Sequence, residues 1–168
     1  MPTSPSAHKR ILIVGAGLGG LALAIALRQR GLRADLIERH ANWPTHGAGI
    51  YLLGNAMRSV ASLGVAAEVQ KQGTHLPSQT LHNHRGKKLV TIDLPAYWGA
   101  VGPCIGIRRA NLQQILVDRL NALALPAPRF ATTVQSVQQL NDAVVVQLND
   151  ASEHEYDVVI GADGIRSS

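Results

Sequence analysis

The sequence predicts an α/β fold that combines a parallel sheet with an inserted β-meander. Three observations lead to this class. Residues 11–14 are a short β-branched run, residues 18–30 are rich in alanine and leucine, and residues 34–38 form a second apolar run. A strand, a helix and a strand in this order form a β-α-β unit, which joins parallel strands. The helix is apolar nearly all round, so we expect it to be covered on both sides and to end at Gly31.

The middle of the chain is less regular. Residues 50–53 are expected to form a short strand, followed by a helix that Asn55 caps and that ends at Gly64. A further short helical piece is expected to end at Gly73. Residues 78–94 have the pattern of a hairpin.

The last third of the chain changes character after one more amphipathic helix at residues 109–120. Asn-Asp pairs at residues 141–142 and 149–150 separate short apolar runs, which predicts a three-stranded meander. Residues 157–160 are expected to form a buried strand that stops at Gly161. The apolar face of the amphipathic helix consists of Leu112, Ile115, Leu116 and Leu120.

Composition excludes several classes of protein. The chain has 168 residues, of which 46% are hydrophobic and 16% charged, which excludes intrinsic disorder and suits about one domain. The net charge is +5, and the basic residues are scattered, so we expect an anionic small molecule as partner and no nucleic acid. Cys104 is the single cysteine, which excludes an intramolecular disulfide and fits a small core residue.

Targeting signals are weak in this sequence. Lys9-Arg10 precede an apolar run at residues 11–27, but four glycines interrupt it and it is shorter than a membrane span. We therefore expect a cytoplasmic protein with no membrane span. Residues 1–8 are rich in proline, serine and threonine and are expected to form a flexible tail.

The strongest signal is the glycine-rich turn at residues 15–20, which follows a strand and opens a helix. Gly15 permits a tight turn, Gly17 lets the backbone approach a pyrophosphate, and Gly20 lets the helix pack closely on the sheet. Ala16 and Leu18 complete the turn, and the free N–H groups of the helix N-terminus favour phosphate. This pattern predicts a site for a dinucleotide.

Glu38 adds an adenosine signal, because it stands at the end of the second predicted strand. A carboxylate there can accept hydrogen bonds from both ribose hydroxyls and repels a 2′-phosphate. The combination predicts a dinucleotide with an adenosine half, and it leaves FAD and NAD as alternatives.

Four segments together resemble the N-terminal part of the group A flavoprotein monooxygenases, the family of para-hydroxybenzoate and salicylate hydroxylase. They are residues 15–38, Gly47-Ala48-Gly49-Ile50, Arg109-Ala110-Asn111-Leu112 and Gly161-Ala162-Asp163-Gly164. The resemblance implies a Rossmann-like FAD/NAD(P)-binding sheet. It also implies that Gly49 lies near the flavin, that Arg39, Arg109 and Asp163 serve FAD, and that NAD(P)H is the co-substrate. Arg108 is the alternative to Arg109.

By the same resemblance, the parent protein hydroxylates an aromatic or similar small molecule with O₂. The family's later FAD motif and substrate domain do not follow residue 168, so we expect residues 9–168 to be a truncated N-terminal portion of an FAD-binding domain. The chain alone is then expected to be inactive, and no catalytic acid or base is identified in it. Related FAD oxidoreductases (an epoxidase, dehydrogenase or halogenase), a non-catalytic dinucleotide-binding remnant and an NAD-binding module are the alternatives.

A metal site is not expected. His82 and His84 alternate and would share one face of a strand, but no third ligand stands at a fixed spacing beside them.

Overall fold

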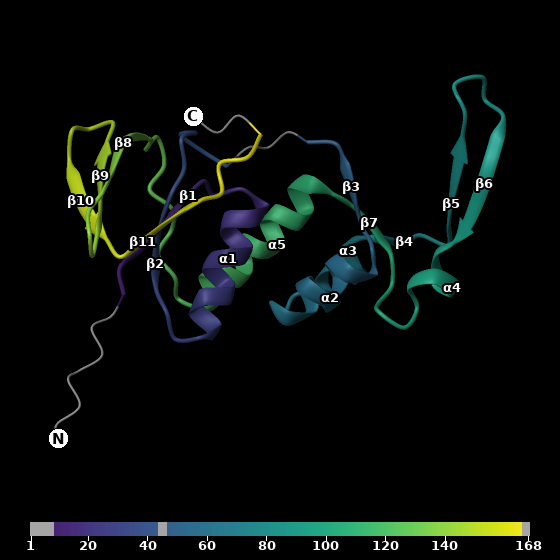
Figure 1. Ribbon diagram of the computed structural model, residues 1–168. Helices are drawn as coiled ribbons and strands as arrows, with labels where there is room; N and C mark the ends of the chain where they lie inside the picture. The colour runs from purple at the N-terminus through teal and green to yellow at the C-terminus, as the bar shows by residue number, and fades with distance from the viewer. Residues whose placement is uncertain (1–8, 44–46, 166–168) are drawn as a thin grey trace. The chain divides into compact units, whose positions relative to one another are not determined.

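The computed structural model describes residues 9–43 and 47–165 (Figure 1), and the expected tail at residues 1–8 lies outside the described residues. The chain divides into two units, each described by itself. The first comprises Met1–Pro44 and Leu116–Ser168, and the second comprises Thr45–Ile115.

The first unit is built on the predicted parallel sheet. β1 (Ile11–Val14) lies between β2 (Ala34–Ile37) and β11 (Val158–Gly161), and both pairs are parallel. α1 (Leu18–Gln29) connects β1 to β2, which confirms the β-α-β unit. Parallel strands need such a crossover, because the chain must return to the same end of the sheet before the next strand begins.

Successive side chains of β1 point to opposite faces of the sheet. One face packs on α1 and the other on the meander. Ile13 faces α1, where its side chain lies beside Gly20. The buried residues of α1 are Gly20, Leu21, Ala24 and Ile25, which share one face. Ala22, Leu23, Ala26 and Leu27, which lie at other positions of the helix, are half-buried, and Arg28 Nε donates to the Leu123 carbonyl (3.4 Å). Gly31 follows the helix with φ +78°, in the conformation expected of a helix stop.

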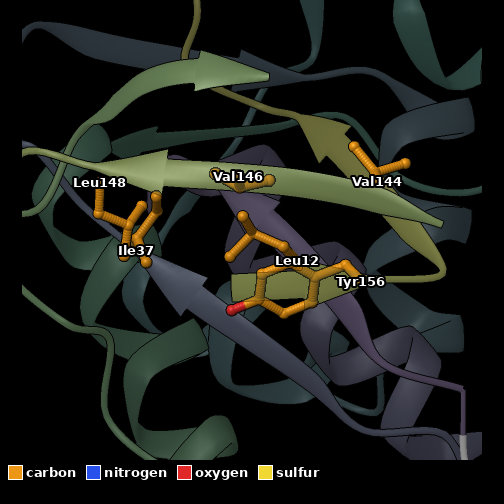
Figure 2. Packing of buried hydrophobic residues seen from close by; sticks show 6 residues of the cluster. All are labelled: Leu12, Ile37, Val144, Val146, Leu148 and Tyr156. Atoms are coloured by element: carbon orange, nitrogen blue, oxygen red, sulfur yellow. The ribbon is translucent and has the colours of Figure 1, made fainter. Parts of the chain in front are cut away.

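The opposite face of the sheet is covered by the predicted meander. β8 (Val134–Gln139), β9 (Val144–Leu148) and β10 (Glu153–Tyr156) form an antiparallel sheet with β9 in the centre. The inward side chains of β9 alternate with half-buried ones, as expected of a strand with one face on a core. Figure 2 shows the resulting cluster, which consists of Leu12, Ile37, Val144, Val146, Leu148 and Tyr156.

β11 differs from its prediction as a buried strand. Val158 is exposed, and Val159 and Ile160 are only half-buried. β11 pairs with β1 alone among the described strands, so it forms an edge of the three-stranded sheet. An apolar β-branched run predicts a strand, but it does not tell a central strand from an edge strand.

A segment that the sequence did not predict as a strand continues the sheet beyond β2. Arg129 forms a parallel bridge with Ile37. The Arg129 N–H donates to the Leu36 carbonyl (2.8 Å), and the Glu38 N–H donates to the Arg129 carbonyl (2.9 Å). The backbone at Glu38 is therefore hydrogen-bonded to Arg129, on the side of β2 that does not pair with β1.

The second unit contains an antiparallel sheet, in which β7 (Ile105–Arg108) lies between β3 (Gly49–Leu52) and β4 (Thr74–His75). Two helices, α2 (Gly54–Ser62) and α3 (Ala66–Gln72), connect β3 to β4. The helix cap predicted at Asn55 is wrong. Leu53, in an extended conformation, is the N-cap and makes no side-chain cap hydrogen bond, so Asn55 lies inside the first turn.

The predicted hairpin is present as β5 (Ser78–His82) and β6 (Lys88–Asp93). His84 lies in the turn that joins them, so the shared strand face expected of His82 and His84 is wrong. A short helix, α4 (Leu94–Trp98), follows β6 and was not predicted. Asp93 caps it by accepting the Ala96 N–H (2.9 Å).

α5 (Arg109–Ala122) follows β7 directly and confirms the predicted amphipathic helix. All four residues of the predicted apolar face are buried, and they are Leu112, Ile115, Leu116 and Leu120. Cys104 is a free, buried thiol next to β7, as expected of a small core residue.

Candidate functional site

The glycine-rich turn leaves β1 with Gly15 at φ +104°, a conformation that favours glycine. A Cβ on Gly15 would lie 2.6 Å from the Ala162 carbonyl oxygen and 2.8 Å from the Asp163 Cα. The Gly15 N–H donates to the Ile37 carbonyl (2.8 Å), and the Ala162 N–H donates to the Val14 carbonyl (2.7 Å). The turn is therefore held against the strands on both sides of β1.

The remaining glycines of the turn have different surroundings. A Cβ on Gly20 would overlap the Gly15 carbonyl oxygen, so Gly20 is required for the close approach of α1 to the turn. A Cβ on Gly17 would meet nothing within 4 Å. Gly17 is the N-cap of α1 and contributes no side-chain cap, while Leu18 begins the helix. The first-turn N–H groups beside Gly17 can therefore receive an anion.

Glu38 lies directly beyond the last residue of β2 and is 8% exposed. Its Oε2 accepts the Ala16 N–H (2.9 Å), and its Oε1 accepts the His40 N–H (3.0 Å). Hydrogen bonds to an ionised acceptor are stronger than neutral ones. Glu38 therefore supports the glycine-rich turn, a role that sequence reasoning missed. A carboxylate oxygen has more than one acceptor direction, so both oxygens keep capacity for a ligand.

A pocket lies beside this turn, at the carboxyl ends of the parallel strands, which is the edge where ligands of open α/β sheets bind. It brings together four of the predicted site residues: Gly15, Glu38, Arg39 and Asp163. Glu38 is buried, Asp163 is half-buried, and Arg39 is exposed. The sequence separates these residues widely, whereas β1, β2 and β11 bring them to one edge.

The same pocket contains two residues that sequence reasoning missed, Thr132 and Thr133. Thr132 is buried, and its hydroxyl donates to the Phe130 carbonyl (2.9 Å). Its N–H donates to the Glu38 carbonyl (3.0 Å), so the threonine segment lies next to Glu38. No spacing or motif marked these threonines, because their position depends on the pairing of residues 129–132 with the chain beyond β2.

Gly49 and Arg109 belong to the second unit and are described within it. Gly49 begins β3 and pairs in register with Arg108, the last residue of β7. A pocket on this sheet is lined by Gly49 and Arg108, together with Tyr51 and Asn111. Arg109 lies beside the preceding loop, since a Cβ on Gly47 would stand 3.2 Å from the Arg109 Cβ. The two candidate arginines therefore have different surroundings.

A polar pair between buried Tyr156 and exposed Asp35 lies elsewhere in the first unit. The Tyr156 hydroxyl donates to Asp35 Oδ2 (3.1 Å). Burial and the Asp35 carboxylate raise the pKa of Tyr156 to about 12. The pair links β10 to β2 and is absent from the pocket of Glu38.

Within residues 9–43 and 47–165, no group of three or more histidine, cysteine or acidic side chains could hold a metal ion. The helices in the same ranges include none that is both long and apolar enough to span a bilayer.

Comparison with known proteins finds similarity to an FAD-binding family and to monooxygenases. A family model described as an FAD binding domain matches residues 8–168. The chain is 34% identical over 159 residues to Aurachin C monooxygenase/isomerase from Stigmatella aurantiaca, covering 94% of this chain and 41% of that protein. It is 32% identical over 168 residues to 6-hydroxynicotinate 3-monooxygenase from Pseudomonas fluorescens, covering 96% and 42%.

A solved structure is similar as well. The structure of Klebsiella pneumoniae HpxO complexed with FAD matches with a TM-score of 0.77 and 26% identity, covering 94% of this chain and 40% of that one. The chain therefore spans about two fifths of the length of these relatives.

Proposed function

Because this chain belongs to the FAD binding domain family, we propose that it is the FAD-binding portion of a flavin-dependent monooxygenase acting on a small aromatic molecule. The observation that carries the proposal is the pocket that joins Gly15, Glu38, Arg39 and Asp163 at the carboxyl edge of the parallel sheet. The names of two relatives, a 6-hydroxynicotinate monooxygenase and a 3-hydroxybenzoate hydroxylase, support an aromatic substrate.

The glycine-rich turn fits the pyrophosphate of FAD. The space beside Gly17 is open, and the free N–H groups of the first turn of α1 are available to phosphate oxygens. In this proposal the backbone of Ala16, Gly17 and Leu18 approaches the pyrophosphate. Gly15 and Gly20 have a different role, because they allow the turn and the helix to pack closely.

Glu38 and its neighbours fit the adenosine half. The carboxylate is already oriented by the N–H groups of Ala16 and His40, so it can accept ribose hydroxyls without further ordering. Arg39 is exposed at the pocket and can lie over the adenine or near a phosphate. Thr132 and Thr133 form the neighbouring part of the pocket.

The remaining predicted residues are proposed to serve FAD as well. Asp163 follows β11 beside the glycine-rich turn and lines the same pocket as Glu38. Gly49 offers backbone without a side chain to a flat ring, and Arg109 offers a cation at the start of α5.

When bound, FAD supplies the oxygen-transfer chemistry of hydroxylation, for which the proposed co-substrates are NAD(P)H and O₂. The residues of this chain bind and orient the cofactor. We propose no proton-transfer residue here. We also propose that the 168-residue chain does not hydroxylate on its own, since the curated relatives are more than twice as long.

The test is a titration of the purified chain with FAD, ADP, AMP and adenosine 2′,5′-bisphosphate, followed by flavin fluorescence and calorimetry. We expect FAD and ADP to bind, and the bisphosphate to bind more weakly than AMP, because its added 2′-phosphate meets the Glu38 carboxylate. Equal affinity for AMP and the bisphosphate, or no binding of FAD and ADP, would contradict the proposal.

Activity is measured separately with FAD, NADPH or NADH, O₂ and a panel that includes 6-hydroxynicotinate and 3-hydroxybenzoate. We expect no hydroxylated product from this chain. Detection of such a product would overturn the proposed inactivity and would leave the assignment of the FAD site intact.

A further inference from the structure

The threonine part of the pocket depends on a backbone segment with little regular structure of its own. Residues 129–133 precede β8 and lie alongside the chain at Glu38. The Arg129 carbonyl accepts the Glu38 N–H (2.9 Å), and the Thr132 N–H donates to the Glu38 carbonyl (3.0 Å). Any shift of this segment therefore moves both the threonines and the backbone of Glu38.

Ala131 interrupts the regular pairing inside this segment. Its φ is +51°, in the left-handed region that an alanine rarely adopts. Its N–H donates to the carbonyl of His40, two residues after Glu38 (3.0 Å). A non-glycine residue in this conformation costs of the order of 1 kcal/mol and persists only where the surroundings hold it.

Asn149 supplies that support from the meander. Its Nδ2 donates to the Ala131 carbonyl (3.0 Å), and its Oδ1 accepts the Thr133 N–H (3.0 Å). Its own N–H donates to the Thr133 carbonyl (3.0 Å). One residue therefore makes three hydrogen bonds to the two residues that flank Thr132.

The support for Asn149 is itself rigid. It directly follows β9, whose Val146 and Leu148 are 0% and 1% exposed in the cluster of Figure 2. The turn after it is held by Asp150, whose carboxylate accepts the Ser152 N–H (3.0 Å) and hydroxyl (2.5 Å). A hydrogen-bonding side chain that is anchored in this way can fix the geometry of the segment it contacts, here residues 131–133.

We propose that Asn149 is a positioning residue for the adenosine half of the cofactor, an inference that rests on the proposed function. It lies outside the set of residues that line the pocket, and acts by holding Ala131 and Thr133 so that Thr132 and the backbone of Glu38 keep their positions. The meander thereby covers the parallel sheet and also shapes the nucleotide pocket.

Two substitutions test the role of the Asn149 amide. Asn149→Ala removes both side-chain hydrogen bonds. Asn149→Asp keeps the shape and the acceptor for Thr133 but replaces the donor to Ala131 with an oxygen. Asn141→Ala is the matched control, because Asn141 begins the other Asn-Asp pair of the meander and is exposed in the turn before β9.

The affinities for ADP and for inorganic pyrophosphate are measured for each purified variant, together with the melting temperature and amide hydrogen exchange. We expect both Asn149 variants to bind ADP about tenfold more weakly, as follows from losing roughly one net hydrogen bond of positioning. Pyrophosphate affinity, which depends on the glycine-rich turn, should stay within a factor of two or so of wild type. Exchange should rise at Ala131–Thr133 and not across β9.

The outcomes separate this inference from the proposed function. A wild-type chain that does not bind ADP overturns the proposed function and, with it, the adenosine role of Asn149. Wild-type binding with unchanged ADP affinity in both Asn149 variants overturns the role of Asn149 alone. Equal losses for ADP and pyrophosphate, or unfolding of both variants, would show a purely structural residue and also overturn it.

Discussion

Glu38 both supports the glycine-rich turn and lines the proposed ligand pocket. Replacing it should therefore change both the free energy of unfolding and the affinity for ADP. In Glu38→Ala the N–H groups of Ala16 and His40 lose a carboxylate acceptor, at 2.9 and 3.0 Å in the wild type. A hydrogen bond to a charged group contributes about 1.5–3 kcal/mol. Removal of a buried carboxylate offsets part of this loss, since its desolvation cost disappears as well.

We therefore expect a destabilisation of about 2–4 kcal/mol for Glu38→Ala and about half as much for Glu38→Gln, which keeps one acceptor oxygen. In a domain of this size this is a fall in melting temperature of about 6–12 °C for the alanine variant. The affinity for ADP should fall by roughly 5- to 150-fold, because two hydrogen bonds to the ribose are lost.

The assay is calorimetric melting of each variant, followed by ADP titration well below the melting temperature. Glu155→Gln is the control, because Glu155 is an exposed carboxylate of the same unit, paired with Arg10 at 2.7 Å. An exposed pair contributes at most about 1 kcal/mol. Unchanged stability in Glu38→Ala would refute the argument that this carboxylate supports the turn, and unchanged ADP affinity would refute the ribose assignment.

Three further predictions concern the turn and the core. Gly17→Val should abolish ADP binding and leave the melting temperature nearly unchanged, because a Cβ there meets no protein atom within 4 Å; titration and melting of one sample check both. Gly15→Ala should destabilise the fold by about 2 kcal/mol or more, measured in urea, because its φ is +104° and the added Cβ would lie 2.6 Å from a carbonyl oxygen. The pKa of Tyr156 is raised to about 12, so the stability from its neutral hydroxyl is complete below pH 10 and is lost as pH rises towards 12. Urea unfolding from pH 8 to 11.5 should show this loss in wild type and in the exposed control Tyr97→Phe but much less in Tyr156→Phe.

Sequence reasoning was most successful where one local pattern determines one element. The glycine-rich turn, α1 and β2 follow one another in a short stretch, and each has its own signal. The meander was predicted from its Asn-Asp turns, and the amphipathic helix from its apolar spacing. The errors have local causes too. Asn55 is a good capping residue by type, but the N-cap is Leu53, in an extended conformation, two residues earlier.

The candidate site was only partly predictable. Glu38 and Asp163 were recognised by their positions after apolar strands, because the carboxyl ends of parallel strands meet at one edge. The hydrogen bonds from Ala16 and His40 to Glu38 were not foreseen. They depend on the direction of one side chain after folding, which no spacing records. α4 could have been found, since Asp93 stands before a leucine and a proline in the pattern of a capped helix start.

By itself, the sequence determined the α/β class and the glycine-rich turn, and it predicted a phosphate role for that turn and an adenosine role for Glu38. Each of these depends on contacts within about 30 residues, where backbone preference and side-chain size act directly. Only the tertiary structure decided that Thr132 and Thr133 join Glu38 in one pocket, and that Asn149 of the meander hydrogen-bonds Ala131 and Thr133. These relations arise from hydrogen bonds between segments far apart in the chain, whose pairing is set by how the meander and α1 pack on opposite faces of the sheet.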